Sequence, residues 1–220
     1  MSKNQQDVST TNNPKLGERF EQAFAFTSRV HHAQVRKDSG EVPYMAHLIA
    51  VASLVLEAGG DEDVAIAALL HDAAEDQGGE AMLQKITERF GARVARIVRD
   101  CSDAFVIPKP PWLERKKAYI AHVHDEADAD VCLVSAADKI HNARSILTDH
   151  YLIGDRVFER FKATKEQTLW YYGEMVNAFD KALRRNGASG ANGGLRRLVM
   201  ELERVVGELL ERAGDKTCRG

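Results

Sequence analysis

Residues 67–76 carry one histidine and three acidic residues directly after an apolar run: His71, Asp72, Glu75 and Asp76. The segment is rich in strong helix formers and has no β-branched residue, which predicts a helix. At about 100° per residue, the four side chains share a sector of roughly 140° on that helix. Acidic groups crowded there would repel one another and lose hydration on burial. A divalent cation bound among them would remove both costs.

Two further residues are candidate ligands for such a cation. His47 lies near the start of a predicted helix, and Asp138 lies in mid-helix after Ser135, Ala136 and Ala137. A carboxylate among small apolar residues is costly unless it has a partner. Two histidines and two aspartates form a mixed nitrogen and oxygen site, which suits Mn²⁺, Fe²⁺ or Zn²⁺ better than Ca²⁺ or a metal that prefers thiolates. A His-Asp pair alone is common on surfaces, so these residue types suggest a metal site without fixing it.

The charge distribution bears on the class of ligand. The chain has 220 residues, enough for one good-sized core, and a formal net charge of −3. Residues 181–220 carry nine Lys and Arg against five Asp and Glu, so the remainder sums to −7. An acidic body gives no support for a nucleic-acid partner. A phosphate-containing ligand would need a local basic pocket or a metal.

The cysteines and the apolar runs bear on the compartment. Cys101, Cys132 and Cys218 are widely spaced, and no pair has metal-ligand or redox spacing. Residues 1–14 are polar and lack the apolar region of a signal peptide, and no run of 18 apolar residues is present. We therefore expect a cytoplasmic protein that does not engage a membrane.

The periodicity predicts an all-α protein, because no segment shows sustained period-two alternation. Residues 1–16 are polar and expected to be disordered, 17–186 form the main domain, and 187–194 contain four glycines and are expected to be a flexible link before 195–220. Helices are predicted at residues 18–34, 44–58, 62–75, 80–90, 92–102, 111–125, 129–147 and 156–185. Asp61 is the expected N-cap of the helix that begins at residue 62.

A last, strongly amphipathic helix is predicted after the link. Its apolar residues recur with three-four spacing: Leu195, Leu198, Val199, Leu202, Val205, Val206, Leu209 and Leu210. This stripe either packs back onto the main domain or forms a dimer seam. We favour packing back, and the chain is expected to be a monomer or a homodimer.

The ordered motifs resemble those of the HD-domain phosphohydrolase superfamily, and more narrowly its guanosine-tetraphosphate (ppGpp) hydrolase branch. That branch comprises the hydrolase domain of Rel/SpoT-type enzymes and the stand-alone small alarmone hydrolases. The extended His-Asp-x-x-Glu-Asp form at 71–76 is far more specific than His-Asp alone. The matching stretches appear in family order over about residues 18–180: 32–37, 43–47, 67–76, 90–94, 114–116 and 137–142.

The resemblance implies an HD-domain helical bundle, extended here by the C-terminal amphipathic helix, and a metal-dependent reaction. The implied metal ligands are His47, His71, Asp72 and Asp138, typically with Mn²⁺, although another divalent metal is possible. Attack at the 3′-linked phosphorus of a guanosine alarmone would release pyrophosphate and leave GDP or GTP. Glu75 and Asp76 are jointly implied as the catalytic acids.

The resemblance also implies residues on the substrate side. Arg36 and Lys37 would face phosphates, and Asn142, one helical turn after Asp138, would contact the nucleotide sugar. Lys139 would support the site through a hydrogen bond or its charge. Tyr44 either stacks near the base or fills the core.

The sequence departs from the family pattern in two places. Leu48 stands where the family usually has proline, a change that a helix N-terminus should tolerate. Residues 161–171 do not reproduce the family's Arg and Tyr four positions apart, although Lys162 or Lys165 could substitute, and this second departure leaves the nucleotide open. The alternatives are an HD phosphohydrolase of another nucleotide, such as pppApp, NADPH or a nucleoside phosphate, and a catalytically silent nucleotide-binding regulator. The intact set of metal-ligand and acidic residues counts against a silent protein.

Overall fold

The computed structural model describes residues 16–37, 41–104, 108–186 and 193–214. Within these ranges the chain forms helices and no strand, so the all-α prediction is confirmed. The predicted disorder of residues 1–16 falls almost entirely outside them. The helices are α1 (Glu18–Val30), α2 (Met45–Glu57), α3 (Glu62–Leu70), α4 (Ala73–Gln77), α5 (Gly79–Phe90), α6 (Ala92–Cys101), α7 (Trp112–Asp125), α8 (Ala129–Ile153), the 3₁₀ helix η1 (Gly154–Arg160), α9 (Lys165–Arg185) and α10 (Gly193–Arg212).

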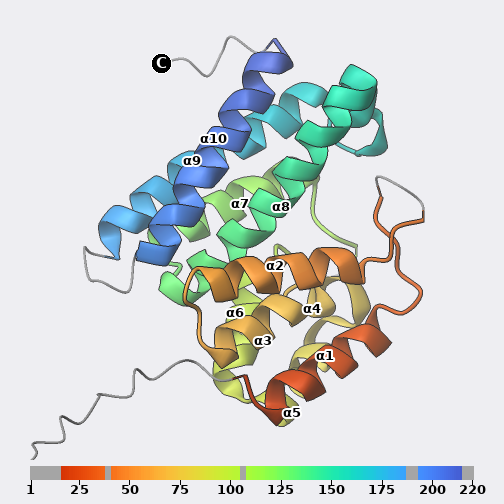
Figure 1. Cartoon of the computed structure of the whole chain (residues 1–220), viewed down its shortest axis with the longest axis vertical. Coiled ribbons are helices and arrows are strands. Elements are labelled where there is room, and N and C mark those ends of the chain that lie inside the picture. Colours follow the sequence, from red (N-terminus) through yellow and green to blue (C-terminus); the bar gives the residue numbers. More distant parts are fainter. Residues whose placement is uncertain (1–15, 38–40, 105–107, 187–192, 215–220) are drawn as a thin grey trace, which may run out of the picture.

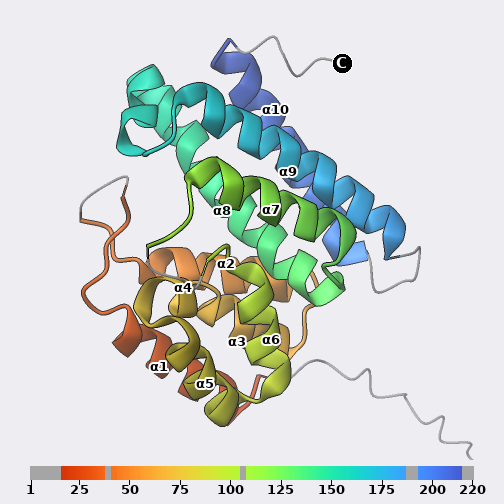
Figure 2. The same cartoon turned by 180° about the vertical axis from the view of Figure 1, so that it is seen from behind.

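The helices form two groups joined by α8 (Figures 1 and 2). Helices α1 to α6 make one half of the molecule, and α7, α9 and α10 make the other. Helix α8 contacts α2, α3 and α6 on one side and α9 and α10 on the other. Its N-terminal half, from Val131 to Ala137, is buried throughout. Asp138 follows this buried stretch, so α8 carries its carboxylate into the centre of the molecule.

Helix α3 is the most deeply buried element. Every residue from Val64 to Leu70 is buried. A helix buried on all sides needs apolar residues all round, which explains why α3 has no polar face. The Asp61 side chain accepts a hydrogen bond from the backbone N–H of Val64, which confirms the predicted N-cap. The core therefore fixes α3 against α2, α6 and α8 and delivers the next residue, His71, to an internal position.

The single helix predicted over residues 62–75 is wrong in one respect, because the chain breaks at His71 and Asp72. The ring Nδ1 of His71 lies 2.8 Å from the carbonyl oxygen of Ala68. In a continuous helix that carbonyl would accept the backbone N–H of Asp72. Competition between side chain and backbone ends α3 at Leu70, and a second short helix, α4, carries Glu75 and Asp76.

The helix predicted over residues 156–185 also begins later than expected. Residues 154–160 form a 3₁₀ helix, and α9 starts after Thr164, where Thr164 and Gln167 form a reciprocal capping box. Helix α8 runs past its predicted end to Ile153, where Gly154 takes a φ of +61°. The link between α8 and α9 therefore carries residues 161–164 along the side of the bundle.

Helix α10 packs along α8 and α9 of its own chain. It begins at Gly193, inside the predicted link, and buries most of the predicted stripe. A Cβ at Gly194 would overlap the carbonyl oxygen of Ala58, so the close approach of α10 to the end of α2 requires glycine there. Arg197 donates a hydrogen bond to the carbonyl of Glu57 at the same junction.

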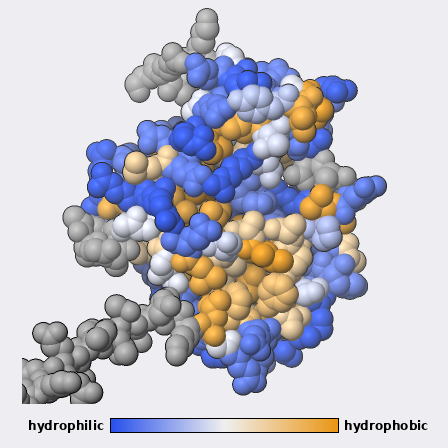
Figure 3. Space-filling view, viewed as in Figure 1, coloured by the Kyte–Doolittle hydropathy of each residue, from blue (hydrophilic) through white to orange (hydrophobic). Residues whose placement is uncertain are grey.

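The surface around α2 is apolar on the face seen in Figure 3. Helix α2 has no charged residue between Met45 and Leu56, and Ile49 is 42% exposed. The surrounding surface is mainly polar. Among the described residues, no helix is long and apolar enough to cross a bilayer.

Candidate active site

The four predicted metal ligands come together from three parts of the fold. His47 lies on α2, His71 and Asp72 lie at the break between α3 and α4, and Asp138 lies on α8. The Nε2 atom of His47 is 3.2 Å from Asp138 Oδ1 and 3.7 Å from Asp72 Oδ2. The Nε2 atom of His71 is 3.1 Å from Asp72 Oδ2 and 3.8 Å from Asp138 Oδ1. Ligand atoms of His47, His71 and Asp138 all lie within 4.8 Å of one another.

The two histidines each direct a ring nitrogen without a hydrogen-bond partner toward the two carboxylates. The Nε2 atoms of His47 and His71 are buried and have no hydrogen-bond partner. A backbone carbonyl only accepts, so the contact with Ala68 places a proton of His71 on Nδ1, and the neutral ring therefore has its lone pair on Nε2. Leaving such atoms unpaired is costly unless something else binds them. Two nitrogen lone pairs facing two carboxylates fit a divalent cation of the kind that takes mixed ligands.

The electrostatics of the cluster favour positive charge at its centre. Burial alone would lower the pKa of His71, but the carboxylates of Asp72 and Asp138 raise it well above its ordinary value. Burial alone would raise the pKa of Asp138, but Lys139 and the two histidines hold it well below its usual range. Burial lowers the pKa of His47, which keeps that ring neutral. The carboxylates therefore stay ionised and attract a cation.

Each of the two carboxylate ligands is held by polar side chains. The hydroxyl of Tyr44 donates to Asp72 Oδ2 at 2.5 Å. Asn142 Nδ2 donates to Asp138 Oδ1 at 2.5 Å, and Lys139 is paired with the other oxygen of the same carboxylate. Three residues expected on the substrate side thus contact the metal-ligand carboxylates directly.

The two candidate catalytic acids have different surroundings. Glu75 accepts hydrogen bonds from Lys109 Nζ at 2.8 Å and from the backbone N–H of Asp103 at 3.2 Å. Burial and the charge of Asp103 raise the pKa of Glu75, while Lys109 opposes the shift. Asp76 accepts a hydrogen bond from Gln34 Nε2 at 2.7 Å. Glu75 therefore holds a proton at higher pH than an ordinary glutamate.

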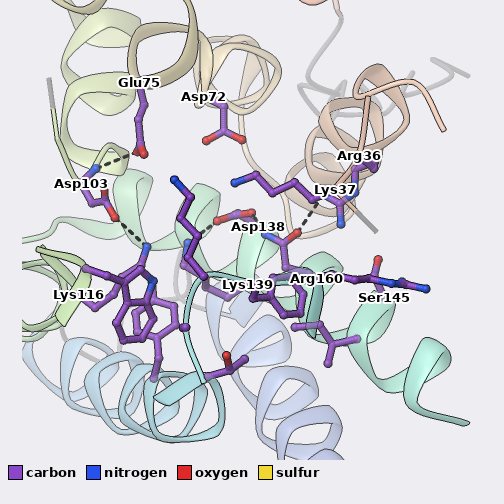
Figure 4. A pocket seen from close by; sticks show the side chains of 18 of the residues that line it. Arg36, Lys37, Asp72, Glu75, Asp103, Lys116, Asp138, Lys139, Ser145 and Arg160 are labelled. Atoms are coloured by element: carbon purple, nitrogen blue, oxygen red, sulfur yellow. Dashed lines mark hydrogen bonds and ion pairs between the residues drawn. The ribbon is translucent and has the colours of Figure 1, made fainter. Parts of the chain in front are cut away.

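All of these groups except the two histidines line one cavity of about 660 Å³ (Figure 4). Figure 4 shows the Asp72 carboxylate above the Asp138 carboxylate, with Arg36 and Lys37 coming from the right-hand side of the view. Asn142 accepts a hydrogen bond from Arg36, which joins the loop after α1 to α8. The lining cations are Arg36, Lys37, Lys109, Arg115, Lys116, Lys139, Arg160 and Lys162.

Several lining residues were not identified as site residues from the sequence. Lys109 and Asp103 reach Glu75 from the segment between α6 and α7, and Lys116 Nζ bonds Asp103 at 2.7 Å. The signal for Lys116 was its place in the family-like stretch 114–116. Of the two lysines considered as substitutes on the late helix, Lys162 lines the cavity, whereas Lys165 pairs with Asp155 at 2.7 Å.

His141, on α8 between Asp138 and Asn142, also contacts the cluster. Its Nδ1 lies 2.8 Å from Nδ1 of His47. Burial, His47 and Arg36 lower the pKa of His141 to about 4, so its ring is neutral.

The comparisons with known proteins agree with this geometry. A family model described as "HD domain" matches residues 23–161, which include all four candidate metal ligands. The chain belongs to the HD-domain family. A human relative, the guanosine-3′,5′-bis(diphosphate) 3′-pyrophosphohydrolase MESH1, is 37% identical over 128 residues, covering 57% of this chain and 68% of that protein. A relative from Aquifex aeolicus with the same enzyme name is 34% identical over 134 residues, covering 60% of this chain and 18% of that protein.

Solved structures share the HD-domain fold. A metazoan ortholog of SpoT that hydrolyses ppGpp superposes with a TM-score of 0.65 at 27% identity, covering 86% of this chain and 95% of that one. A Listeria monocytogenes protein gives a TM-score of 0.63 at 27% identity, covering 75% of this chain and 99% of that one.

Proposed function

We propose that this HD-domain protein is a metal-dependent hydrolase that removes the 3′-pyrophosphate from the guanosine alarmones ppGpp and pppGpp, leaving GDP or GTP. The observation that carries the proposal is the convergence of two histidines and two aspartates at one point, with the aspartates and two further acids lining a cavity that also contains cations. The enzyme names of the relatives support the same reaction. We place the protein in the cytoplasm, with Mn²⁺ as its metal.

The metal would be held by His47, His71, Asp72 and Asp138. A divalent cation bound there supplies Lewis acidity and lowers the pKa of water. Tyr44, through its hydrogen bond, holds the carboxylate of Asp72 in one orientation. Lys139 and Asn142 do the same for Asp138. Such support keeps ligand atoms directed at one point.

Glu75 and Asp76 would carry out the proton transfers of the reaction. Water attacks the 3′-linked phosphorus, the bond from phosphorus to the ribose oxygen breaks, and pyrophosphate leaves. One proton must be taken from the water and one must reach the ribose oxygen. We assign these transfers to Glu75 and Asp76 jointly, because both carboxylates line the cavity and lie one turn after the metal-ligand pair.

The substrate phosphates would be bound by local cations, because the body of the protein is acidic. Arg36, Lys37 and Lys162 line the cavity from the loop after α1 and from the link before α9. Lys37 and Lys162 are exposed, so they can reach a ligand without losing a buried partner. They would bind the phosphates that do not react.

Replacing Lys162 with glutamine should raise KM about tenfold or more and leave kcat and metal content unchanged. A hydrogen bond to a charged group contributes about 1.5–3 kcal/mol, and this one would form equally in the ground state and the transition state. Steady-state kinetics with ppGpp measures the effect. Lys165→Gln is the matched control, and equal KM values for the two variants would remove Lys162 from the substrate site.

Replacing Lys109 with glutamine should shift part of the kcat–pH profile of the enzyme to higher pH. The positive charge of Lys109 lowers the pKa of Glu75, so its removal raises that pKa further. The limb of the kcat profile that reports Glu75 should therefore shift to higher pH, whether Glu75 gives or takes the proton. Lys109→Arg should keep the parent profile. A limb that stays in place in Lys109→Gln would show that Glu75 does not titrate in the rate-determining step.

A panel of nucleotides tests the substrate class. Purified, Mn²⁺-loaded protein should release pyrophosphate from ppGpp and pppGpp, with GDP or GTP as the other product. The panel includes pppApp and NADPH, because the departures near residues 161–171 affect the part of the site that selects the nucleotide. Turnover of NADPH or pppApp without turnover of ppGpp would assign the protein to a different substrate.

A further inference from the structure

His141 and His47 share a hydrogen bond between two ring nitrogens, and neither the motif nor the proposed reaction gives this contact a role. The two Nδ1 atoms are 2.8 Å apart, with ring centroids at 4.8 Å and ring planes at 52°. One neutral ring must donate the proton and the other must accept it. The direction of this bond decides which nitrogen of His47 carries a lone pair.

The other nitrogen of His47 fixes the direction. Its Nε2 atom is buried, has no hydrogen-bond partner and lies 3.2 Å from Asp138 Oδ1. A metal ligand at this position must offer a lone pair on Nε2, so the proton of His47 belongs on Nδ1. His47 then donates to His141 Nδ1, and His141 keeps its own proton on Nε2.

The two histidine ligands are therefore oriented by different kinds of partner. His71 donates to the carbonyl of Ala68, which can only accept. His47 donates to the ring of His141, whose Nδ1 can donate or accept a hydrogen bond according to its tautomer. A side chain can be replaced without altering the backbone, so the contribution of the acceptor to metal binding can be measured at His47.

We propose that His141 is a positioning residue that fixes the tautomer and ring orientation of His47 for metal binding. The inference rests on the metal centre proposed above. Loss of such an outer partner typically weakens metal affinity by about 10- to 100-fold. His141 itself binds neither metal nor substrate in this role.

Two substitutions at position 141 separate positioning from packing. His141→Leu fills similar space but removes the acceptor, and His141→Asn places an amide oxygen where ring Nδ1 stood. Calorimetric titration of the metal-free protein with Mn²⁺ should give a Kd about 10- to 100-fold weaker for His141→Leu and within about threefold of the parent for His141→Asn. His32→Leu, at an exposed histidine, is the matched control and should bind Mn²⁺ like the parent.

Equal affinity in the parent and His141→Leu, or equal loss in the Leu and Asn variants, would overturn the inference. ¹⁵N NMR of the imidazoles tests it on the unsubstituted chain, before any variant is made. With diamagnetic Zn²⁺ bound to the parent protein, His47 should be protonated on Nδ1, and an Nδ1 that carries no proton would overturn the inference. If the parent binds no divalent cation in the titration, the proposed metal centre fails, whereas metal binding that does not depend on His141 refutes the positioning role alone.

Discussion

Asp138→Asn is expected to empty the metal site and abolish hydrolysis. The substitution keeps the shape of the side chain but removes the charge that faces Nε2 of His47 at 3.2 Å and of His71 at 3.8 Å. It also replaces an oxygen ligand by a group that binds metals weakly or, in the flipped orientation, donates. Metal analysis of the purified protein should find none, and turnover of ppGpp should fall to background.

Lys139 complicates this variant, because its ammonium is buried beside Asp138. An unpaired buried charge is destabilising, so the fold must be checked by circular dichroism and thermal unfolding. Asp149→Asn, also on α8 and in the same cavity, is the control, and it should keep its metal. A folded Asp138→Asn protein with parent metal content would disprove the assignment of this ligand.

Glu75→Gln and Asp76→Asn should each lower kcat by about 10² or more while metal content and fold are retained. This is the scale expected for loss of general acid–base catalysis. The hydrogen-bond partners of the two carboxylates are Gln34, Asp103 and Lys109 rather than the histidine ligands, so the metal ligands should stay in place without them. Single-turnover kinetics on Mn²⁺-loaded protein measures the chemical step directly.

Glu80→Gln is the matched control for these two variants, because Glu80 is an exposed acid on the adjacent helix α5. It should turn over ppGpp like the parent. If both Glu75→Gln and Asp76→Asn did the same, the protons would have to move through other groups. Loss of metal in either variant would instead make that residue a ligand.

The helical class could be predicted from the sequence because burial imposes a period, and no segment had the period of a strand. The break at His71 could not, since it depends on a ring nitrogen taking the carbonyl of Ala68 from the backbone. The end of α8 at Ile153 was missed for a different reason. Residues 148–153 carry no strong apolar pattern, and in the structure Asp149 and His150 pair with η1 while Tyr151 pairs with Glu208 of α10.

The identity of the metal ligands was implied by the ordered motifs, but only the folded structure shows that these ligands meet at one point. His47 and Asp138 are far apart in sequence, and only the packing of α2 against α8 brings them together. Lys109 and Asp103 could not be foreseen, because they reach Glu75 from an irregular segment with no helical period. Tyr44 was ambiguous in the sequence because a tyrosine ring can stack near a base or fill the core, and the structure instead places its hydroxyl on Asp72.

The most direct test is the hydrolysis of ppGpp in H₂¹⁸O by Mn²⁺-loaded protein, with mass spectrometry of both products. Attack at the 3′-linked phosphorus predicts GDP and pyrophosphate in equal amounts, with ¹⁸O in the pyrophosphate, none in GDP, and no reaction after chelation of the metal. Inorganic phosphate as the product, ¹⁸O in GDP, or turnover that survives chelation would contradict a metal-dependent 3′-pyrophosphohydrolase.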